Sequence, residues 1–143
     1  MNVETILRSK GGAVATVGPS TTIRDAAALL RRDRIGALVV SADGAKVDGI
    51  LSERDIVHGL ADRGAPLLDA LVEELMTRRV YTCTARDSVG DLMAMMTERR
   101  IRHIPVLKDG ALAGIVSIGD VVKHRLDEIE YEASSLRSFI AGA

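Results

Sequence analysis

Apolar residues recur at helical spacing in two stretches of the chain, residues 23–30 and residues 89–96. A polar turn that can cap a helix precedes each stretch, at residues 20–22 and at residues 87–88. Two short apolar runs follow each stretch, IGALVV with GILS and then RHIPVL with GIVS, and such runs are typical of buried strands. The pattern predicts one helix followed by two strands, twice over.

Further signals complete each copy of this pattern. A short extended piece precedes each helix, at residues 13–17 and 80–84. An Asp-Gly dipeptide, which is favoured in tight hairpins, stands between the two strands of each copy, at residues 43–44 and 109–110. A polar cluster and a second helix follow the last strand. The predicted order of elements is therefore β-α-β-β-α in each copy.

The two copies align without gaps when residues 16–40 are laid over residues 82–106. The matching pairs, each 66 residues apart, are Thr16 with Thr82, Ile23 with Val89, Asp25 with Asp91 and Ile35 with Ile101. One turn residue later the offset becomes 65, and the pairs are Gly49 with Gly114, Ser52 with Ser117 and Asp55 with Asp120. An internal repeat of this kind means that the chain contains two copies of one structural unit.

A unit of about 55 residues buries its sheet face poorly when alone, so we expect the copies to pack together about a pseudo-twofold axis, with one core and two equivalent clefts. The expected fold class is α/β (α+β), with an extra C-terminal helix. We divide the chain into repeat 1 at residues 1–65, a connector helix at 66–76, repeat 2 at 77–126 and a C-terminal helical extension at 127–143. The apolar stripe of the extension needs a partner from its own chain or from a second copy.

Composition narrows the classes of function. A net charge of −1 gives no electrostatic reason to expect nucleic acid or an anionic membrane as partner. The chain has no Trp, two Tyr and one Phe, which leaves little aromatic surface for stacking bases. The single cysteine, Cys83, excludes an intrachain disulfide. No apolar run reaches the roughly 18 residues of a membrane span, and the N-terminus lacks the apolar centre of a signal peptide, so we expect a cytoplasmic protein.

A Ser-x-x-Asp motif ends the last strand of each copy, in GILSERDIV at residues 49–57 and in GIVSIGDVV at residues 114–122. An aspartate at the start of a helix lies where exposed N–H groups and the helix dipole favour an anion. Its remaining oxygens can accept hydrogen bonds from two adjacent hydroxyls, such as those of a ribose. The residues also allow a second interpretation, in which both motifs only cap the helices.

These features together resemble a known family. The doubled β-α-β-β-α unit, the IRHIP and GIVSIGDV segments, the LMT before the second copy and the paired Ser-x-x-Asp motifs closely resemble tandem CBS domains, the pair called a Bateman module. The resemblance covers about residues 3 to 126 and looks most like stand-alone bacterial pairs. It implies binding of AMP, ADP or ATP, or of NAD(H) or S-adenosylmethionine, and a role as an energy or redox sensor without a catalytic cofactor.

The resemblance also assigns residues to two nucleotide sites, with each base placed against the other copy. Asp55 and Asp120 are assigned to ribose, and the two serines to phosphate or sugar. The first predicted site comprises Ser52, Arg54, Asp55, Val80, Tyr81, Thr82, Arg102, His103, Ile104 and Pro105. The second predicted site comprises Lys10, Gly12, Ala13, Ile35, Gly36, Ala37, Ser117 and Asp120.

The cations available to bind phosphate are unequal in the two sites. The candidates are Arg54, Arg102, His103 and Lys10. The second copy has Gly119 where the first has Arg54. The first copy has Gly36-Ala37 where the second has Arg102-His103. We therefore expect unequal ligands or affinities, with more phosphate charge at Asp55.

The motifs give no support to an enzyme. GIVSIG at residues 114–119 misses the G-x-S-x-G spacing of a nucleophile elbow, and neither a P-loop nor H-E-x-x-H is present. His58, His103 and His124 lack metal-ligand spacing, so no metal is expected. Cys83 is predicted to be a small buried hydrophobic residue, with redox sensing left open.

The sequence thus leaves two hypotheses. The first is a nucleotide-sensing homodimer in which ligand binding changes the conformation and so regulates a protein effector. The second is a non-catalytic structural adaptor with vestigial clefts, which acts through its C-terminal helix. Two intact aspartates favour the first hypothesis.

Overall fold

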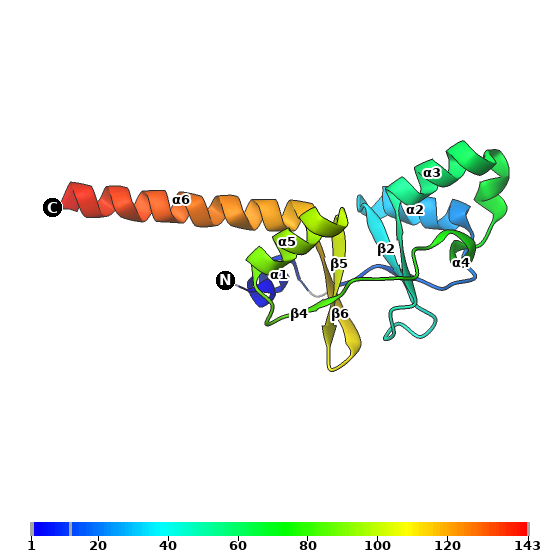
Figure 1. Ribbon diagram of the computed structural model, residues 1–143, viewed down its shortest axis with the longest axis horizontal. Helices are drawn as coiled ribbons and strands as arrows, with labels where there is room; N and C mark the ends of the chain where they lie inside the picture. The colour runs from blue at the N-terminus through cyan, green and yellow to red at the C-terminus, as the bar shows by residue number, and fades with distance from the viewer. Residues whose placement is uncertain (1, 12, 143) are drawn as a thin grey trace.

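The computed structural model describes residues 2–11 and 13–142, which form two small sheets flanked by helices (Figure 1). The helices are α1 (Val3–Lys10), α2 (Ile23–Asp33), α3 (Glu53–Arg63), α4 (Val72–Leu75), α5 (Val89–Arg99) and α6 (Ile118–Gly142), with a 3-10 helix η1 (Ala65–Asp69). The strands are β1 (Thr16–Val17), β2 (Ala37–Val40), β3 (Gly49–Ser52), β4 (Cys83–Thr84), β5 (His103–Lys108) and β6 (Ala111–Ser117). The predicted fold class is confirmed.

The two sheets share one topology. β2 lies between β1 and β3, with β1 parallel and β3 antiparallel to it. β5 lies in the same way between β4 and β6. Figure 1 shows the sheets side by side, with α2, α3, α5 and α6 along the upper side of the view. The predicted β-α-β-β-α order is confirmed in both copies.

Helices α2 and α5 begin and end in the same way. Thr22 accepts a hydrogen bond from the backbone N–H three residues later at 3.2 Å, and Ser88 does the same at 3.0 Å. Both predicted caps are thereby confirmed. Each helix ends on an arginine in the left-handed region, Arg34 and Arg100, both with φ of 54°. The internal repeat therefore extends to individual backbone angles.

The two connections between antiparallel strands differ from each other. Asp109 and Gly110 alone join β5 to β6, and their φ angles of 53° and 81° fit the predicted tight turn. The tight hairpin predicted at residues 43–44 is wrong, because residues 41–48 all separate β2 from β3. The Asp43 carboxylate accepts hydrogen bonds from the N–H groups two and three residues later, at 2.9 and 2.8 Å, and these bonds organise a wider loop.

Each repeat completes its core with the segment that precedes the other repeat. Val3 and Ile6 of α1 are buried in the core of the second repeat. Val72 and Met76, from the connector, are buried in the core of the first repeat. The segments are fastened in equivalent ways, because the N–H of Val3 donates to the second repeat at 2.9 Å and that of Val72 to the first repeat at 2.7 Å. The two repeats are therefore interlocked.

The connector departs from the single helix expected over residues 66–76. It forms η1, then an extended pair at Ala70 and Leu71, and then α4. The backbone of the extended pair bonds to the start of α2, where the N–H of Ile23 donates to the carbonyl of Ala70 at 2.9 Å. These inter-segment bonds replace helical ones, which explains the break.

A repeated glycine allows both preceding segments to approach the sheets. A Cβ on Gly49 would lie 2.6 Å from Met76 Sδ, and one on Gly114 would lie 2.7 Å from Leu7 Cδ2. Both distances are shorter than van der Waals contact, so any side chain would push the connector or α1 away. The glycine pair seen in the sequence therefore serves close packing between the repeats.

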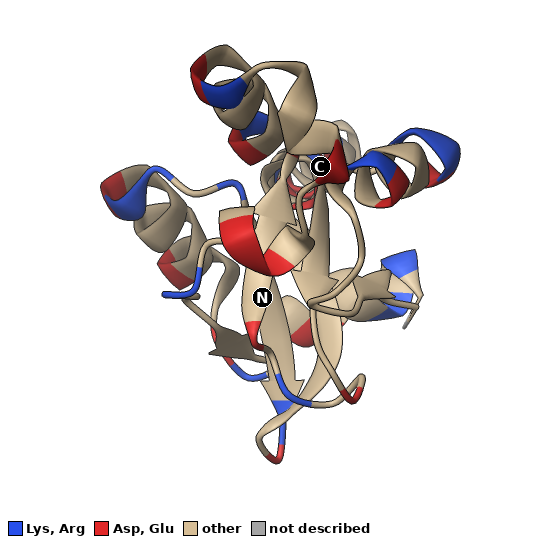
Figure 2. Cartoon of the chain, turned by 90° about the vertical axis from the view of Figure 1, so that its right-hand side faces the viewer, with Lys and Arg blue, Asp and Glu red and all other residues tan. Residues whose placement is uncertain are grey.

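Charged residues lie mainly on the outer faces of the helices and in loops, with both signs interleaved, whereas the sheets are largely free of them (Figure 2). In the described ranges, no helix combines the length and apolar character needed to cross a membrane.

Candidate functional site

Each Ser-x-x-Asp motif forms a reciprocal hydrogen-bonded cap at the start of a helix. Ser52 Oγ accepts from the backbone N–H of Asp55 at 3.2 Å, and Asp55 Oδ2 accepts from that of Ser52 at 3.0 Å. Ser117 and Asp120 form the same two bonds at 3.2 and 2.8 Å. Among the described residues the bonds engage Oδ2 of each aspartate, so capping is compatible with acceptance of a ligand hydroxyl by Oδ1.

The two caps lie at equivalent places in the two sheets. The strand register pairs Ala37 with Ser52 at the start of β2. It pairs His103 with Ser117 at the start of β5. The start of each central strand, which the sequence assigned to the other copy's site, thus also lies directly beside the cap of its own repeat.

The ammonium group of Lys10 binds the aspartate of the second motif. Its Nζ donates to Asp120 Oδ2 at 2.7 Å and to the carbonyl of Ile115 at 2.8 Å. The side chains of Lys10 and Asp120 are 30% and 23% exposed. Burial acts to raise the pKa of Asp120, but hydrogen bonds from Lys10 and Ser117 outweigh it and hold the pKa below its ordinary value of 3.8. The charge of Asp120 is therefore balanced from within the chain.

His103 joins the two repeats. A Cβ on Gly36 would lie 3.1 Å from His103 Nε2 and 3.4 Å from Glu53 Oε1, so the imidazole packs directly on the backbone of repeat 1. Burial lowers the pKa of His103 below 6.5, and the charge of Lys10 lowers it further, whereas Glu53 and Asp120 act in the opposite direction. The fold therefore favours the neutral form of this side chain.

The two arginines predicted to bind phosphate near Asp55 are exposed to solvent. Neither Arg54 nor Arg102 forms a hydrogen bond or an ion pair with its guanidinium group within residues 2–11 and 13–142. Lys10, by contrast, is engaged with Asp120. Of the three side chains predicted to bind phosphate as permanent cations, Lys10 is therefore the one with an ion-pair partner among the described residues.

Several predicted site residues belong to the sheets and their cores. The buried ones are Ala37, Ile104 and Pro105. The side chain of Ile104 lies in the core of the second repeat, so only its backbone is available to a ligand. Ile35 packs against the first core, and Ala13 is exposed. Gly12 lies outside the described residues.

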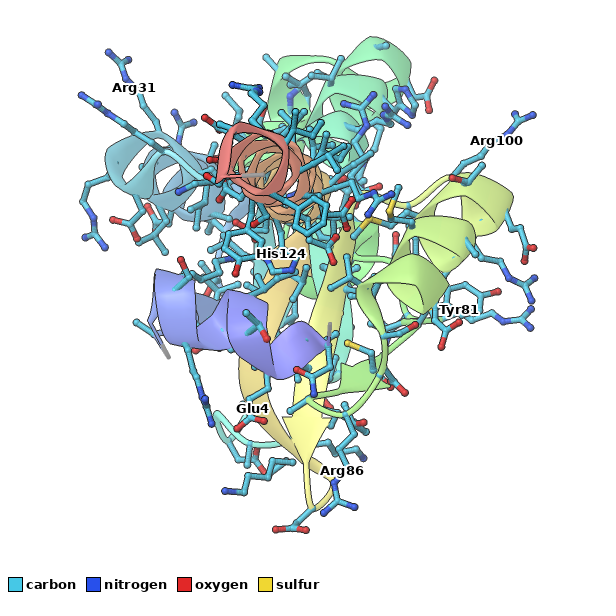
Figure 3. All side chains as sticks on the ribbon, turned by 90° about the vertical axis from the view of Figure 1, so that its left-hand side faces the viewer. Glu4, Arg31, Tyr81, Arg86, Arg100 and His124 are labelled. Atoms are coloured by element: carbon cyan, nitrogen blue, oxygen red, sulfur yellow. The ribbon has the colours of Figure 1, made fainter. Side chains whose placement is uncertain are left out.

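The aromatic ring predicted to lie near the base is already in contact with cations. The guanidinium groups of Arg79 and Arg99 lie 5.9 and 5.0 Å from the centre of the Tyr81 ring. Figure 3 shows Tyr81 beside α5. Its neighbours Val80 and Thr82 are half-buried.

Hollows of about 620 and 520 Å³ are lined in part by Gly119 and by Glu53, which neighbour the two motif aspartates in the sequence. The larger follows one face of α6, and the smaller lies between α2 and α3. Neither Asp55 nor Asp120 lines them. The candidate site therefore rests on the paired motifs and their neighbours.

Sequence reasoning missed two contacts of this site. Glu53 was assigned to neither predicted site, yet its carboxylate lies next to Gly36 and His103. Lys10 was proposed as a phosphate ligand, and its direct bond to Asp120 was not foreseen. The position of Glu53 in the first turn of a helix between Ser52 and Asp55 was the available signal for the first contact.

Other reactive groups are not arranged for chemistry. Cys83 is 3% exposed, and burial, with a smaller contribution from the charge of Asp87, raises the pKa of its thiol to about 12. The described part of the chain brings together no group of three His, Cys, Asp or Glu side chains that could hold a metal ion.

The family model of the CBS domain matches this chain twice, over residues 6–62 and 72–127. A curated relative, the mitochondrial CBS domain-containing protein CBSX3 of Arabidopsis thaliana, is 34% identical over 148 aligned residues, which cover 98% of this chain and 72% of the relative. The crystal structure of the CBS-domain containing protein ATU1752 from Agrobacterium tumefaciens is 47% identical, with a TM-score of 0.84, and the match covers 87% of this chain and 99% of that one.

Two similar structures contain adenosine compounds. The CBS domain pair of protein MJ0100, in complex with 5′-methylthioadenosine and S-adenosyl-L-methionine, is 27% identical with a TM-score of 0.79 and covers 90% of this chain and 98% of that one. The CBS domain protein PAE2072 from Pyrobaculum aerophilum, complexed with AMP, is 27% identical with a TM-score of 0.73 and covers 84% and 89%. The matching family model is that of the CBS domain, and it indicates no catalytic family.

Proposed function

The chain belongs to the CBS domain family as a tandem pair, and on this premise we propose that it is a regulatory module that binds an adenosine-containing ligand. The complexes of the MJ0100 pair with 5′-methylthioadenosine and S-adenosyl-L-methionine and of PAE2072 with AMP support this class of ligand. We propose AMP, ADP, ATP or NAD(H) as the ligand of this chain.

The observation that carries the proposal is the pair of capped aspartates. Asp55 and Asp120 each hold Oδ2 in a cap, which fixes the side chain and leaves Oδ1 to accept hydrogen bonds. The vicinal hydroxyls of a ribose are donors of the right spacing for one carboxylate.

The Asp55 site is the better candidate for a ligand with several phosphates. Arg54 and Arg102 are exposed there and make no internal ion pair within the described residues. One guanidinium group can donate two parallel hydrogen bonds to two oxygens of the same phosphate. At Asp120 the ammonium of Lys10 already donates to Oδ2, so the carboxylate charge is balanced within the chain and Oδ1 remains to accept a ligand hydroxyl.

Regulation requires that ligand favour one arrangement of the two repeats over another. His103 and Glu53 come from different repeats and meet at Gly36, so a ligand bound there would act on the contact between repeats. We propose that the protein works as a homodimer without catalysis, and that it transmits this change to a protein effector.

A structural adaptor is the second candidate. The observation that favours it is the C-terminal part of α6, where Leu136 and Phe139 are 60% and 76% exposed. An adaptor with vestigial sites would bind no adenosine compound and would act through this helix alone.

A thermal-shift panel of AMP, ATP, NAD and S-adenosylmethionine, with GMP and CMP as controls, tests the proposal. Ligand at a hundred times its dissociation constant stabilises the native state by about 2.7 kcal/mol. We expect a shift with an adenosine compound in the wild type and no shift in the double variant Asp55→Asn and Asp120→Asn, in which the amide oxygen still caps each helix. No shift with any adenosine compound would reject the sensor and favour the adaptor.

A further inference from the structure

One face of α6 carries a regular series of apolar side chains. They are Val122, Leu126, Ile129, Ala133, Leu136 and Ile140, at intervals of four, three, four, three and four residues. All but Ala133 are at least 47% exposed. This spacing is the a/d pattern of a heptad repeat, which places all six residues on one seam of the helix.

Among the described residues, the seam has no partner within the fold. α6 packs on α1, α5 and β6 through its first turns, and Figure 1 shows the rest of the helix projecting clear of the other elements. The buried residue of α6 is Val121, which lies in the second core rather than on the seam. The hollow of about 620 Å³ follows the same face and includes Val122 and Leu126 in its lining.

We propose that a second copy of this chain covers the seam, and that the two α6 helices form a parallel, in-register coiled coil. The charged residues beside the seam carry this choice of partner. In a parallel pair, Arg125 faces Glu130 of the second copy, and Glu132 faces Arg137 of the second copy. By symmetry each pairing occurs twice. Arg125 and Glu132, the charged residues at the g positions beside the seam, therefore each face a residue of opposite charge.

The antiparallel arrangement lacks this complementarity. It overlaps all six seam residues only when Val122 lies opposite Ile140. In this arrangement e positions face e positions and g positions face g positions of the second copy. Glu130, at an e position, then meets Glu130, and Glu132, at a g position, meets Glu132. Lys123 would face Arg137 in the same arrangement. The charge pattern therefore selects the parallel orientation.

A parallel pair fixes the orientation of the dimer. α6 begins directly after β6, so parallel helices place repeat 2 of one copy beside repeat 2 of the other. This inference rests on the homodimer in the proposed function and adds its orientation and its contact. It does not depend on the ligand, so both tests are run without nucleotide.

Disulfide cross-linking tests the register. Leu136→Cys should give a covalent dimer under mild oxidation, because position 136 meets itself in a parallel pair. Ser138→Cys, on the opposite face of the same turn, should not, and neither should the parent protein with its buried Cys83. The proposal is overturned if Leu136→Cys stays monomeric on a denaturing gel, or if it cross-links only when mixed with Leu126→Cys, which is the antiparallel pairing.

A charge exchange provides an independent test by analytical ultracentrifugation. Glu130→Arg sets like charges opposite each other and should weaken the dimer several-fold. Adding Arg125→Glu should restore the affinity, although residues five apart on a helix do not touch within one chain. A double variant as weak as Glu130→Arg, or a wild type that is monomeric, would overturn the coiled coil. Adenosine binding would remain untouched by either outcome.

Discussion

Replacing Lys10 with methionine tests how firmly α1 is held to the second repeat. Methionine keeps most of the aliphatic length and removes the ammonium that donates to Asp120 Oδ2 at 2.7 Å and to the carbonyl of Ile115 at 2.8 Å. A hydrogen bond to a charged group contributes about 1.5 to 3 kcal/mol to stability. Since the two side chains are 30% and 23% exposed, solvent screening reduces this value, and we expect a loss of about 1 to 2 kcal/mol.

Urea unfolding at pH 7, followed by circular dichroism, measures this loss. Arg8→Met is the matched control, because it removes a cation from the same helix whose partner Glu4 is 51% exposed, and it should change stability little. Lys10→Met and Arg8→Met variants of equal stability would refute the argument.

The pH dependence adds a second criterion. The pKa of Asp120 is lowered in the fold, so the ion pair stabilises the native state above the unfolded value of 3.8. That stability is lost as the pH falls through the folded pKa. The difference between wild type and Lys10→Met should therefore shrink below pH 3.8. A difference that stayed constant down to full protonation would show that charge is not its cause.

Three further predictions concern the core and the repeat junction. Gly49→Ala should destabilise the protein by about 1 to 3 kcal/mol through overpacking, whereas Gly90→Ala, whose Cβ would meet nothing closer than 3.9 Å, should not, as judged by urea unfolding. His103 should titrate below pH 6.5 by NMR, and Glu53→Gln should lower its midpoint further because that carboxylate raises the pKa; a midpoint above 6.5 would contradict this. His103 binds a proton more readily in the unfolded chain than in the fold. The free energy of unfolding should therefore decrease as the pH falls through 6.5. Cys83 should resist a thiol reagent in the native protein and react in denaturant, and rapid native labelling would contradict its burial.

The parts of the fold that the sequence predicted correctly are those determined by residues close together in the sequence. Helix caps at Thr22 and Ser88, and the turn at residues 109–110, depend on neighbouring residues alone. The alignment of the first copy with the second then gave the right order of these elements. Local signals therefore sufficed for the architecture of each repeat.

Most of the parts that were missed depend on contacts between residues far apart in the sequence. α1 has few apolar residues, and Val3 and Ile6 find their burial only in the second repeat. Lys10 and Asp120 are 110 residues apart, so their bond leaves no local trace. The loop at residues 41–48 was missed because an Asp-Gly pair fits both a tight turn and the wider loop that Asp43 organises. Long-range packing decided the first two features, whereas local hydrogen bonds of Asp43 decided the loop.

The same distinction applies to the candidate site. The paired motifs were visible in the sequence because their capping bonds span three residues. The meeting of His103 with Gly36 joins two repeats and required the structure. The cation already paired with Asp120 likewise emerged only from the fold.

Isothermal titration calorimetry of ATP and AMP into the wild type, Asp55→Asn and Asp120→Asn tests the central claim most directly. The account predicts binding that Asp55→Asn weakens about ten- to hundredfold, the loss of a charge-assisted hydrogen bond, while all three proteins keep the same circular dichroism. Asp120→Asn should retain the ATP site, because Arg54 and Arg102 lie with Asp55 in our assignment. Equal ATP affinity in the wild type and Asp55→Asn would contradict the role of this aspartate in binding the ribose.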